Sequence, residues 1–179
     1  MPELVDCKLE YPLSPRFHLF EKLRIFSTCD LPQMQLLTPL VRVVQSVGRQ
    51  LQKEGASLES CLPVSCVFSD SDTFSLRLLP EEKAVVSRII FFSLPRLAPY
   101  YGTKTLYVIL TEELCRQFWS IHGEALVAFK VFEILRRIFP ELEIEEIYSR
   151  DIADLYHKWA GDQPEEAEDL PVGRRPFSS

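Results

Sequence analysis

The sequence predicts an α+β fold, in which a small mixed or antiparallel sheet, with a hairpin near residues 64–79, is covered by several helices. Segments in which apolar and polar residues alternate, as in strands, occur between segments in which apolar residues recur at helical spacing. The 179 residues are 46% hydrophobic and 11% aromatic, which is enough for one ordinary core without disulfides or metal. We therefore expect a single domain over residues 1–160.

The first part of the chain predicts one strand followed by two helices. Apolar residues alternate with charged ones over 5–11, which is typical of a half-buried strand. A helix is expected over 14–26, because Ser14 followed by proline resembles an N-cap with proline at the first helical position. Thr38 repeats this signal before a run of apolar residues at helical spacing, and Gly55 supplies a stop for this second helix.

The middle of the chain predicts a hairpin and then an ambiguous segment. Residues 64–68 and 74–78 alternate in hydrophobicity on either side of a polar turn, so we expect an antiparallel hairpin with one wet face. Over 80–92, Pro80 and the two acidic residues after it favour a helix, which is the interpretation we prefer. The apolar run at 89–92 would equally suit a buried strand.

Three further elements are expected before residue 140. Two prolines, paired tyrosines and a glycine predict an irregular loop over 95–103. The run Thr-Leu-Tyr-Val-Ile-Leu at 105–110 is apolar on both faces, which indicates a central strand of a covered sheet. Residues 111–139 predict a long helical region that Gly123 bends or divides, and its apolar side chains cover more surface than one flank of a sheet can hide.

The carboxy-terminal part contains one more helix and a tail. Residues 142–148 fit neither period clearly. Ser149 is a suitable N-cap for a final helix whose apolar side chains, up to Trp159, share one face. Residues 161–179 are acidic, contain prolines and have few large apolar side chains, so we expect a disordered tail.

Composition narrows the classes of function. The net charge of −6 and the scattered lysines and arginines make direct nucleic-acid binding unfavourable. The first residues lack the pattern of a secretory signal, and no stretch is long enough to span a bilayer. Five irregularly spaced cysteines suit a compartment in which thiols stay reduced. We therefore expect an intracellular protein, cytoplasmic or nuclear, rather than a secreted one.

No motif predicts catalysis, a cofactor or a metal. The six glycines are not clustered, so neither phosphate-binding loop motif is present, and no Gly-x-Ser-x-Gly elbow occurs. The nearest candidates for zinc ligands are Cys61 with Cys66 and Cys115 with His122, but the cysteines at 66 and 115 lie in apolar patterns typical of a core. The glutamates within 141–146 are interpreted as a solvated acidic face.

The residues most typical of a protein interface are aromatic residues and arginines in two regions. Exposed tyrosine and arginine anchor many interfaces, and the loop over 95–101 contains both. The apolar surplus of the carboxy-terminal helices is a second candidate surface. The predicted partner-binding residues are Arg96, Tyr100, Tyr101, Phe118, Trp119 and Phe132.

These features favour a non-enzymatic protein–protein interaction module, a subunit or adaptor of an intracellular multiprotein complex that binds other proteins. One alternative is an enzyme whose catalytic residues meet only in the fold. A second alternative is a nucleic-acid-associated subunit, which would require folding to gather Arg42, Arg49, Lys53 and Arg88 on one face.

Overall fold

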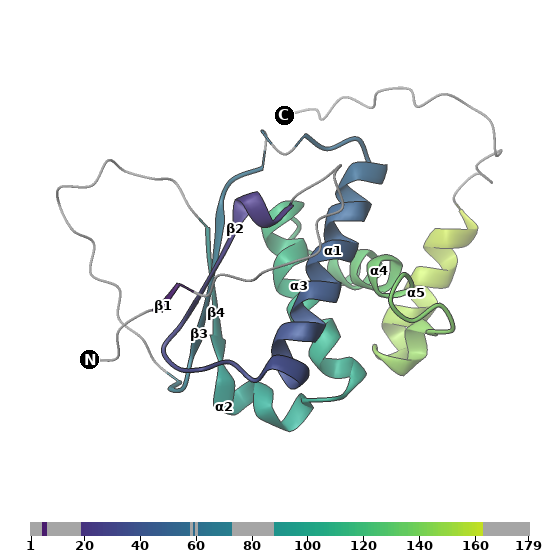
Figure 1. Ribbon diagram of the computed structural model, residues 1–179. Helices are drawn as coiled ribbons and strands as arrows, with labels where there is room; N and C mark the ends of the chain where they lie inside the picture. Colours follow the sequence, from purple (N-terminus) through teal and green to yellow (C-terminus); the bar gives the residue numbers. More distant parts are fainter. Residues whose placement is uncertain (1–4, 7–18, 58, 60, 73–87, 163–179) are drawn as a thin grey trace.

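A computed structural model describes residues 5–6, 19–57, 59, 61–72 and 88–162, and its strands form one mixed sheet (Figure 1). The sheet order is β1-β2-β3-β4, with β1 antiparallel to β2 and the other three strands parallel. The prediction of a mixed or antiparallel sheet is therefore confirmed in its mixed form, but most of the strand pairs are parallel. The strands are β1 (Val5–Asp6), β2 (Leu23–Ser27), β3 (Val64–Ser69) and β4 (Arg88–Ser93).

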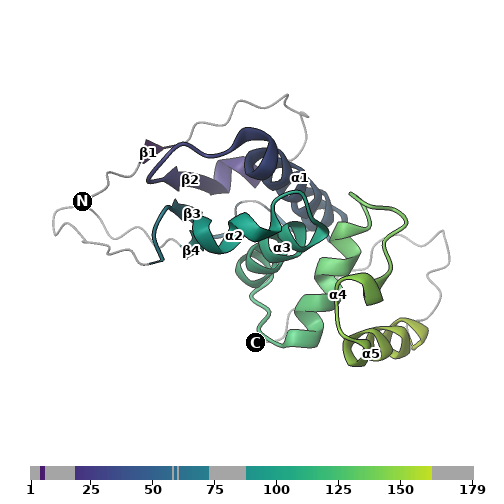
Figure 2. The same cartoon turned by 90° about the horizontal axis from the view of Figure 1, so that it is seen from below.

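The helices form two layers on one side of this sheet. α1 and α3 lie next to the sheet, and α4 and α5 lie beyond them (Figures 1 and 2). In the described part of the chain no helix covers the opposite face. The helices are α1 (Thr38–Lys53), α2 (Leu94–Leu97), α3 (Lys104–Phe118), α4 (Glu124–Leu135) and α5 (Arg150–Gly161), and short turns occur at η1 (Leu19–Lys22), η2 (Gln33–Leu37), η4 (Ala98–Tyr100) and η5 (Ile144–Glu146).

The core lies between the sheet and its first layer of helices. Side chains alternate along a strand, so the aligned residues Ile25, Cys66 and Ile90 share one face, and all three are buried. Phe68 stacks on Phe92 across the same face, with ring centroids 4.9 Å apart. Helix α1 buries one apolar stripe against this face, because its valines recur at helical spacing.

Two helix predictions are wrong, because strands occupy part of each segment. In the predicted helix over 14–26, residues from Leu23 onward form β2, where Arg24 is exposed between two buried neighbours. Burial with a period of two and pairing with β3 outweigh the weak helical spacing. In the segment over 80–92, residues from Arg88 onward form β4, so the strand alternative is correct there. Residues 7–18 and 80–87 lie outside the described residues.

The hairpin and one strand prediction are also wrong. Both edges of β3 are paired with parallel strands, β2 and β4, rather than with an antiparallel partner. The predicted partner segment, 74–78, lies outside the described residues. Residues 105–110 form the first turns of α3, because Leu106, Leu110 and Leu114 fall on one helix face and are fully buried. A short apolar run on a buried helix resembles a buried strand.

The other helix predictions are confirmed, with shifted boundaries. Helix α1 and helix α5 form where the spacing predicted them. The region over 111–139 is divided before Gly123, as expected, but its first half begins in α3 at Lys104. The predicted loop over 95–103 instead contains α2 and the turn η4. Because α3 and α4 also pack on α1 and on each other, a second helical layer buries most of the apolar surplus.

Candidate functional site

The six predicted partner-binding residues lie in two separate places. Arg96, Tyr100 and Tyr101 precede α3, near the carboxyl end of β4, whereas Trp119 follows α3. Because α3 has 15 residues, its two ends are about 22 Å apart. Phe132 belongs to α4, which packs beside α3. The fold therefore does not bring the six residues together into one site.

The first place is a polar network at the carboxyl ends of the parallel strands. The Asp72 carboxylate accepts a hydrogen bond from Ser93 Oγ at 2.6 Å and pairs with Arg96 Nε at 3.1 Å. The hydrogen bond from Ser93, aided by the charge of Arg96, holds the pKa of Asp72 below its ordinary value. Thr28 Oγ1 likewise donates to the carboxylate of Asp70 at 2.9 Å. These contacts tie neighbouring strand ends together, so the polar group of Arg96 is already engaged within the chain.

The second place begins at Glu54, which follows α1 directly. Its carboxylate accepts hydrogen bonds from Trp119 Nε1 and from Lys130 Nζ, each at 2.6 Å. The Lys130 ammonium also lies 5.5 Å from the centroid of the Trp119 ring, within cation–π range. Glu54 thereby joins α1 to the end of α3 and to α4. Phe118, one residue before Trp119, is half-buried against the core.

Both ionisable groups of this contact are held in their charged forms. Burial opposes ionisation of Glu54, but hydrogen bonds from Lys130, Trp119 and Gln50 outweigh it and lower the pKa of Glu54. Burial likewise opposes the charge on Lys130, but the hydrogen bond to Glu54 and the charge of Glu133 raise the pKa of Lys130. The two shifts agree in sign, so the ion pair persists through neutral pH as a structural link.

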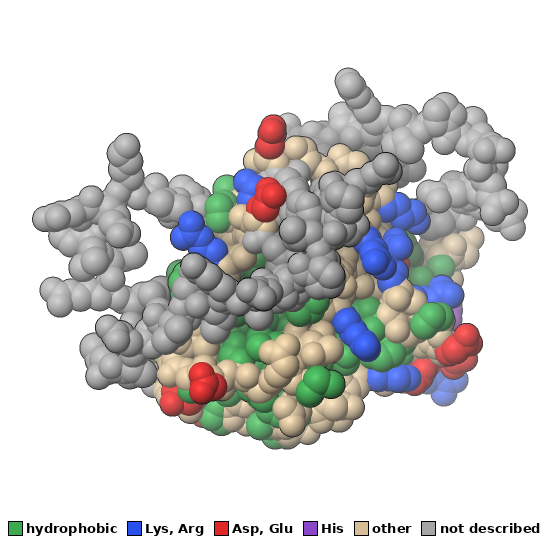
Figure 3. All heavy atoms as spheres, in the orientation of Figure 1, with side chains coloured by type: hydrophobic (Ala, Val, Ile, Leu, Met, Phe, Trp, Pro, Cys, Tyr) green, Lys and Arg blue, Asp and Glu red, His purple; other side chains and the backbone are tan. Residues whose placement is uncertain are grey.

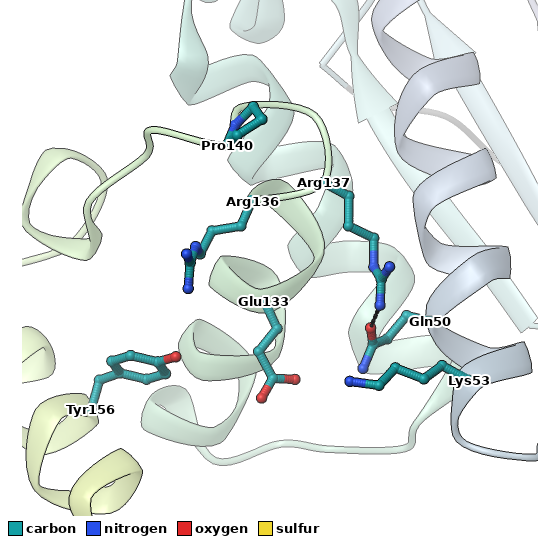
Figure 4. A pocket seen from close by; sticks show the side chains of 7 residues that line it. All are labelled: Gln50, Lys53, Glu133, Arg136, Arg137, Pro140 and Tyr156. Carbon is teal, nitrogen blue, oxygen red and sulfur yellow. Dashed lines mark hydrogen bonds between the residues drawn. The ribbon is translucent and has the colours of Figure 1, made fainter. Parts of the chain in front are cut away.

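A cavity of about 330 Å³ lies beside this link, where α1, α4 and α5 converge (Figure 4). Helix α1 supplies side chains from its last turn, and α4 supplies its carboxyl end with the residues that follow. Tyr156 of α5 forms the remaining wall, and Glu133 extends into the space between Tyr156 and Lys53. We call this space the basic cavity. Its lining residues are Gln50, Lys53, Glu133, Arg136, Arg137, Pro140 and Tyr156.

Three cations and one carboxylate line the basic cavity. The carboxylate is that of Glu133, and it lies 3.3 Å from the Nζ atom of Lys130, a residue that does not line the cavity. Arg137 donates to Gln50 Oε1, a neutral group, at 2.7 Å. Among the described residues, no carboxylate forms an ion pair with Lys53, Arg136 or Arg137. Lysine and arginine side chains gather over α1, α4 and α5 in Figure 3. The basic cavity therefore carries an uncompensated positive charge.

Helix geometry explains why the sequence tolerates these cations together. Lys53 is the last residue of α1, and Arg136 caps the carboxyl end of α4. The helix dipole places partial negative charge at carboxyl ends, which stabilises cationic side chains there. Because both helices end at the same place, positive charge from two elements distant in sequence collects around one cavity.

Aromatic contacts hold the wall that α5 contributes. The ring of Tyr156 packs edge-on against Phe132 with centroids 4.9 Å apart and against Phe129 at 5.3 Å. Phe132 is 6% exposed, so it supports the wall from beneath instead of being presented to a partner. Burial and the nearby charge of Glu133 raise the pKa of Tyr156. Its hydroxyl therefore stays protonated at neutral pH and can donate a hydrogen bond.

The sequence analysis did not predict the basic cavity. The adjacent arginines at 136 and 137 were visible in an acidic chain, but the residues that complete the lining come from three separate helical regions. Their convergence depends on the packing of α4 against α1 and α5. The sequence contains no local pattern that links Gln50 or Tyr156 to the arginine pair.

Four residues proposed for nucleic-acid contact are only partly gathered. Arg42, Arg49 and Lys53 are exposed and fall on one stripe of α1, because their spacings of seven and four return to the same helix face. Arg88 begins β4, and its guanidinium donates to Ser120 Oγ at 3.0 Å. Three of the four residues therefore share a face, and the fourth lies on another element.

Two of the described cysteines are core residues, whereas Cys29 is exposed and Cys61 is half-buried. Cys66 and Cys115 are fully buried, and burial raises the pKa of Cys66 to about 12 and raises that of Cys115 as well. Over the described ranges, no three His, Cys, Asp or Glu side chains form a group suited to a metal ion. In the same ranges, no helix is both long and apolar enough to cross a membrane.

Comparison with known proteins adds no further constraint: no family model, no curated protein and no solved structure matches this chain.

Proposed function

We propose that this protein is a non-enzymatic interaction module, a subunit or adaptor of an intracellular multiprotein complex, and that its basic cavity binds an acidic segment of a partner protein. The observation that carries the proposal is the presence of three cations without carboxylate partners among the described residues. A protonated tyrosine hydroxyl shares their cavity. The four described cysteines form no disulfide with one another, which suits the intracellular setting proposed here.

The chemistry of the lining favours carboxylates as the bound groups. Arginine presents a planar fork of donors that matches a carboxylate in two parallel hydrogen bonds. Arg136 and Arg137 are adjacent, and Lys53 adds a compact charge from the facing helix. A volume of about 330 Å³ accommodates one or two side chains and not a whole folded element. An extended segment carrying neighbouring Asp or Glu residues fits these limits.

The same lining gives less support to the enzyme alternative. Acid–base catalysis requires a titratable group poised near neutral pH within reach of a substrate. The carboxylate in the basic cavity, Glu133, is paired with Lys130 at 3.3 Å, and among the residues that the structure describes neither a histidine nor a cysteine lines the cavity. These features are those of a binding surface.

A comparison of two charge-matched variants tests the proposal. In the cavity variant, Lys53, Arg136 and Arg137 are changed to Gln. In the control variant, three exposed arginines outside the cavity lining, at positions 42, 49 and 150, are changed to Gln. Each tagged full-length variant is used to recover partners under gentle conditions, and the purified partner's affinity is then measured in salt titrations.

We expect a stoichiometric protein partner that the cavity variant loses and the control variant retains. Binding by the control variant should weaken as salt rises, because exposed charges are screened. Equal retention by both variants would refute the proposed site. Selective loss by the control variant, with recovery sensitive to nuclease, would instead support the nucleic-acid alternative carried by α1.

A further inference from the structure

The chain contains an acidic segment next to the basic cavity in sequence. Helix α5 places Tyr156 in the cavity wall and ends at Gly161. The segment that follows contains four acidic residues within five positions, Glu165, Glu166, Glu168 and Asp169. A segment rich in carboxylates, the groups that the basic cavity favours, therefore follows directly in the sequence after the helix that supplies Tyr156 to the cavity wall.

We propose that residues 165–169 of this chain occupy its own basic cavity and thereby compete with the acidic partner segment. The partner half of this statement rests on the proposed function. Occupancy by the chain's own segment does not, because it depends only on the cavity and on the residues that follow α5.

The length of the connection is sufficient. Six residues separate Tyr156 from Asp162, which corresponds to about 9 Å along a helix axis. An extended chain spans at most about 3.5 Å per residue, so Glu165 reaches roughly 10 Å from Asp162 and Asp169 roughly 25 Å. The segment can therefore turn back along α5 and bring its carboxylates to the level of Tyr156.

Charge and tethering both favour this occupancy. The basic cavity has three cations against one carboxylate, and that carboxylate is paired with Lys130. Four carboxylates on a short connection act at an effective concentration in the millimolar range. A partner must displace the segment, so its apparent affinity is reduced by the fraction of molecules in which the cavity is open.

Zero-length cross-linking of the full chain tests the proposal, because Lys53 supplies a primary amine inside the basic cavity. A carbodiimide joins an amine to a carboxylate in direct contact, and mass spectrometry identifies the joined peptides. Lys158 lies in the last turn of α5, seven positions before Glu165 in the sequence, and serves as a reference for simple proximity. Lys104, at the far end of α3, serves as the negative reference.

We expect links between 165–169 and Lys53, and none to Lys104. Changing Arg136 and Arg137 to Gln should lower the Lys53 yield roughly tenfold relative to Lys158, since two charge contacts of the exposed kind together correspond to about that factor. The substitution Lys53→Arg keeps the charge and should abolish the link. Neutralising the four acidic residues should abolish links to both lysines.

Three results would overturn the proposal. They are links to Lys158 alone, a Lys53 yield that the arginine changes leave unaltered, or links that join two copies in a mixture of isotopically labelled and unlabelled chains. The last result would assign the segment to a second copy. Because no partner is added, failure here leaves the proposed function standing, whereas failure of the partner experiment leaves any Lys53 link intact.

Discussion

The Glu54 side chain links α1 to the end of α3 and to α4. Changing Glu54 to Ala removes the acceptor of three donors, namely Trp119 Nε1, Lys130 Nζ and Gln50 Nε2, each at 2.6 Å. Lys130, whose side chain is 21% exposed, then keeps Glu133 at 3.3 Å as its one carboxylate partner among the described residues, together with the Trp119 ring. The variant should therefore leave a charge partly buried and an indole without its partner.

The expected loss of stability follows from these contacts. A hydrogen bond to a charged group is worth about 1.5–3 kcal/mol when it is well buried. The Glu54 side chain is 31% exposed, so water replaces part of what is lost. Glu54 also lies at the carboxyl end of α1, where removing a negative charge returns about 0.5 kcal/mol. We expect a net loss of about 2 kcal/mol, or about 4–8 °C in Tm for a domain of this size.

Thermal and urea unfolding of the full chain measure this loss, and a double-mutant cycle with Lys130→Met isolates the ion pair. We expect a coupling energy of about 1–2 kcal/mol. The matched control is Glu145→Gln, which removes an exposed contact with His157 and should leave the free energy of unfolding essentially unchanged, because water screens that contact. A Glu54→Ala variant as stable as the wild type, or a coupling energy near zero, would show that this link does not hold the helices.

Three further outcomes are expected. Phe132→Ala should lower the free energy of unfolding by about 3–5 kcal/mol, because the Phe132 side chain is 6% exposed. Tyr100 is 40% exposed, so Tyr100→Ala should change the free energy of unfolding by less than about 1 kcal/mol. Chemical denaturation of the two variants measures both changes. A thiol reagent should modify exposed Cys29 in the native protein but buried Cys66 only after unfolding, as mass spectrometry would reveal. The pKa of Glu54 in the folded protein lies below the ordinary value of a glutamate, so its contribution to stability is complete above that ordinary value and is lost as the pH falls through the folded-state pKa. Glu54→Gln should therefore flatten the acid limb of a plot of unfolding free energy against pH.

Strong periodicity made the helices at α1 and α5 predictable, because α1 buries one stripe over several turns and α5 half-buries one. Short apolar runs were not predictable in the same way. Residues 89–92 and 105–110 are equally apolar, yet the first lies in β4 and the second in α3. Which structure each adopts is decided by its neighbours in the fold, because β4 pairs along its length with β3, whereas α3 packs against α1 and α4.

The sequence displays some residues of the candidate site but does not indicate that they lie together. Arg136 and Arg137 are adjacent in the sequence, but their role depends on Lys53 and Tyr156, which two other helices bring to the same cavity. Of the predicted partner-binding residues, Phe132 is buried against Tyr156, a contact between α4 and α5 that the sequence does not indicate. The sequence analysis assumed that the apolar side chains of the carboxy-terminal helices would face the sheet. It therefore did not predict that helices packing on one another would bury these side chains.

Nuclear magnetic resonance can locate acidic-peptide binding directly. The probe is a hexaglutamate peptide, titrated into the full chain with Glu165, Glu166 and Glu168 changed to Gln and Asp169 to Asn, so that the chain's own acidic residues do not compete. If the basic cavity is the binding site, the amide signals of its lining residues, Gln50, Lys53, Glu133, Arg136, Arg137 and Tyr156, should shift in a saturable manner that added salt reverses. Shifts centred on Arg96, Tyr100 and Tyr101, or the absence of any localised shift, would contradict binding at the basic cavity.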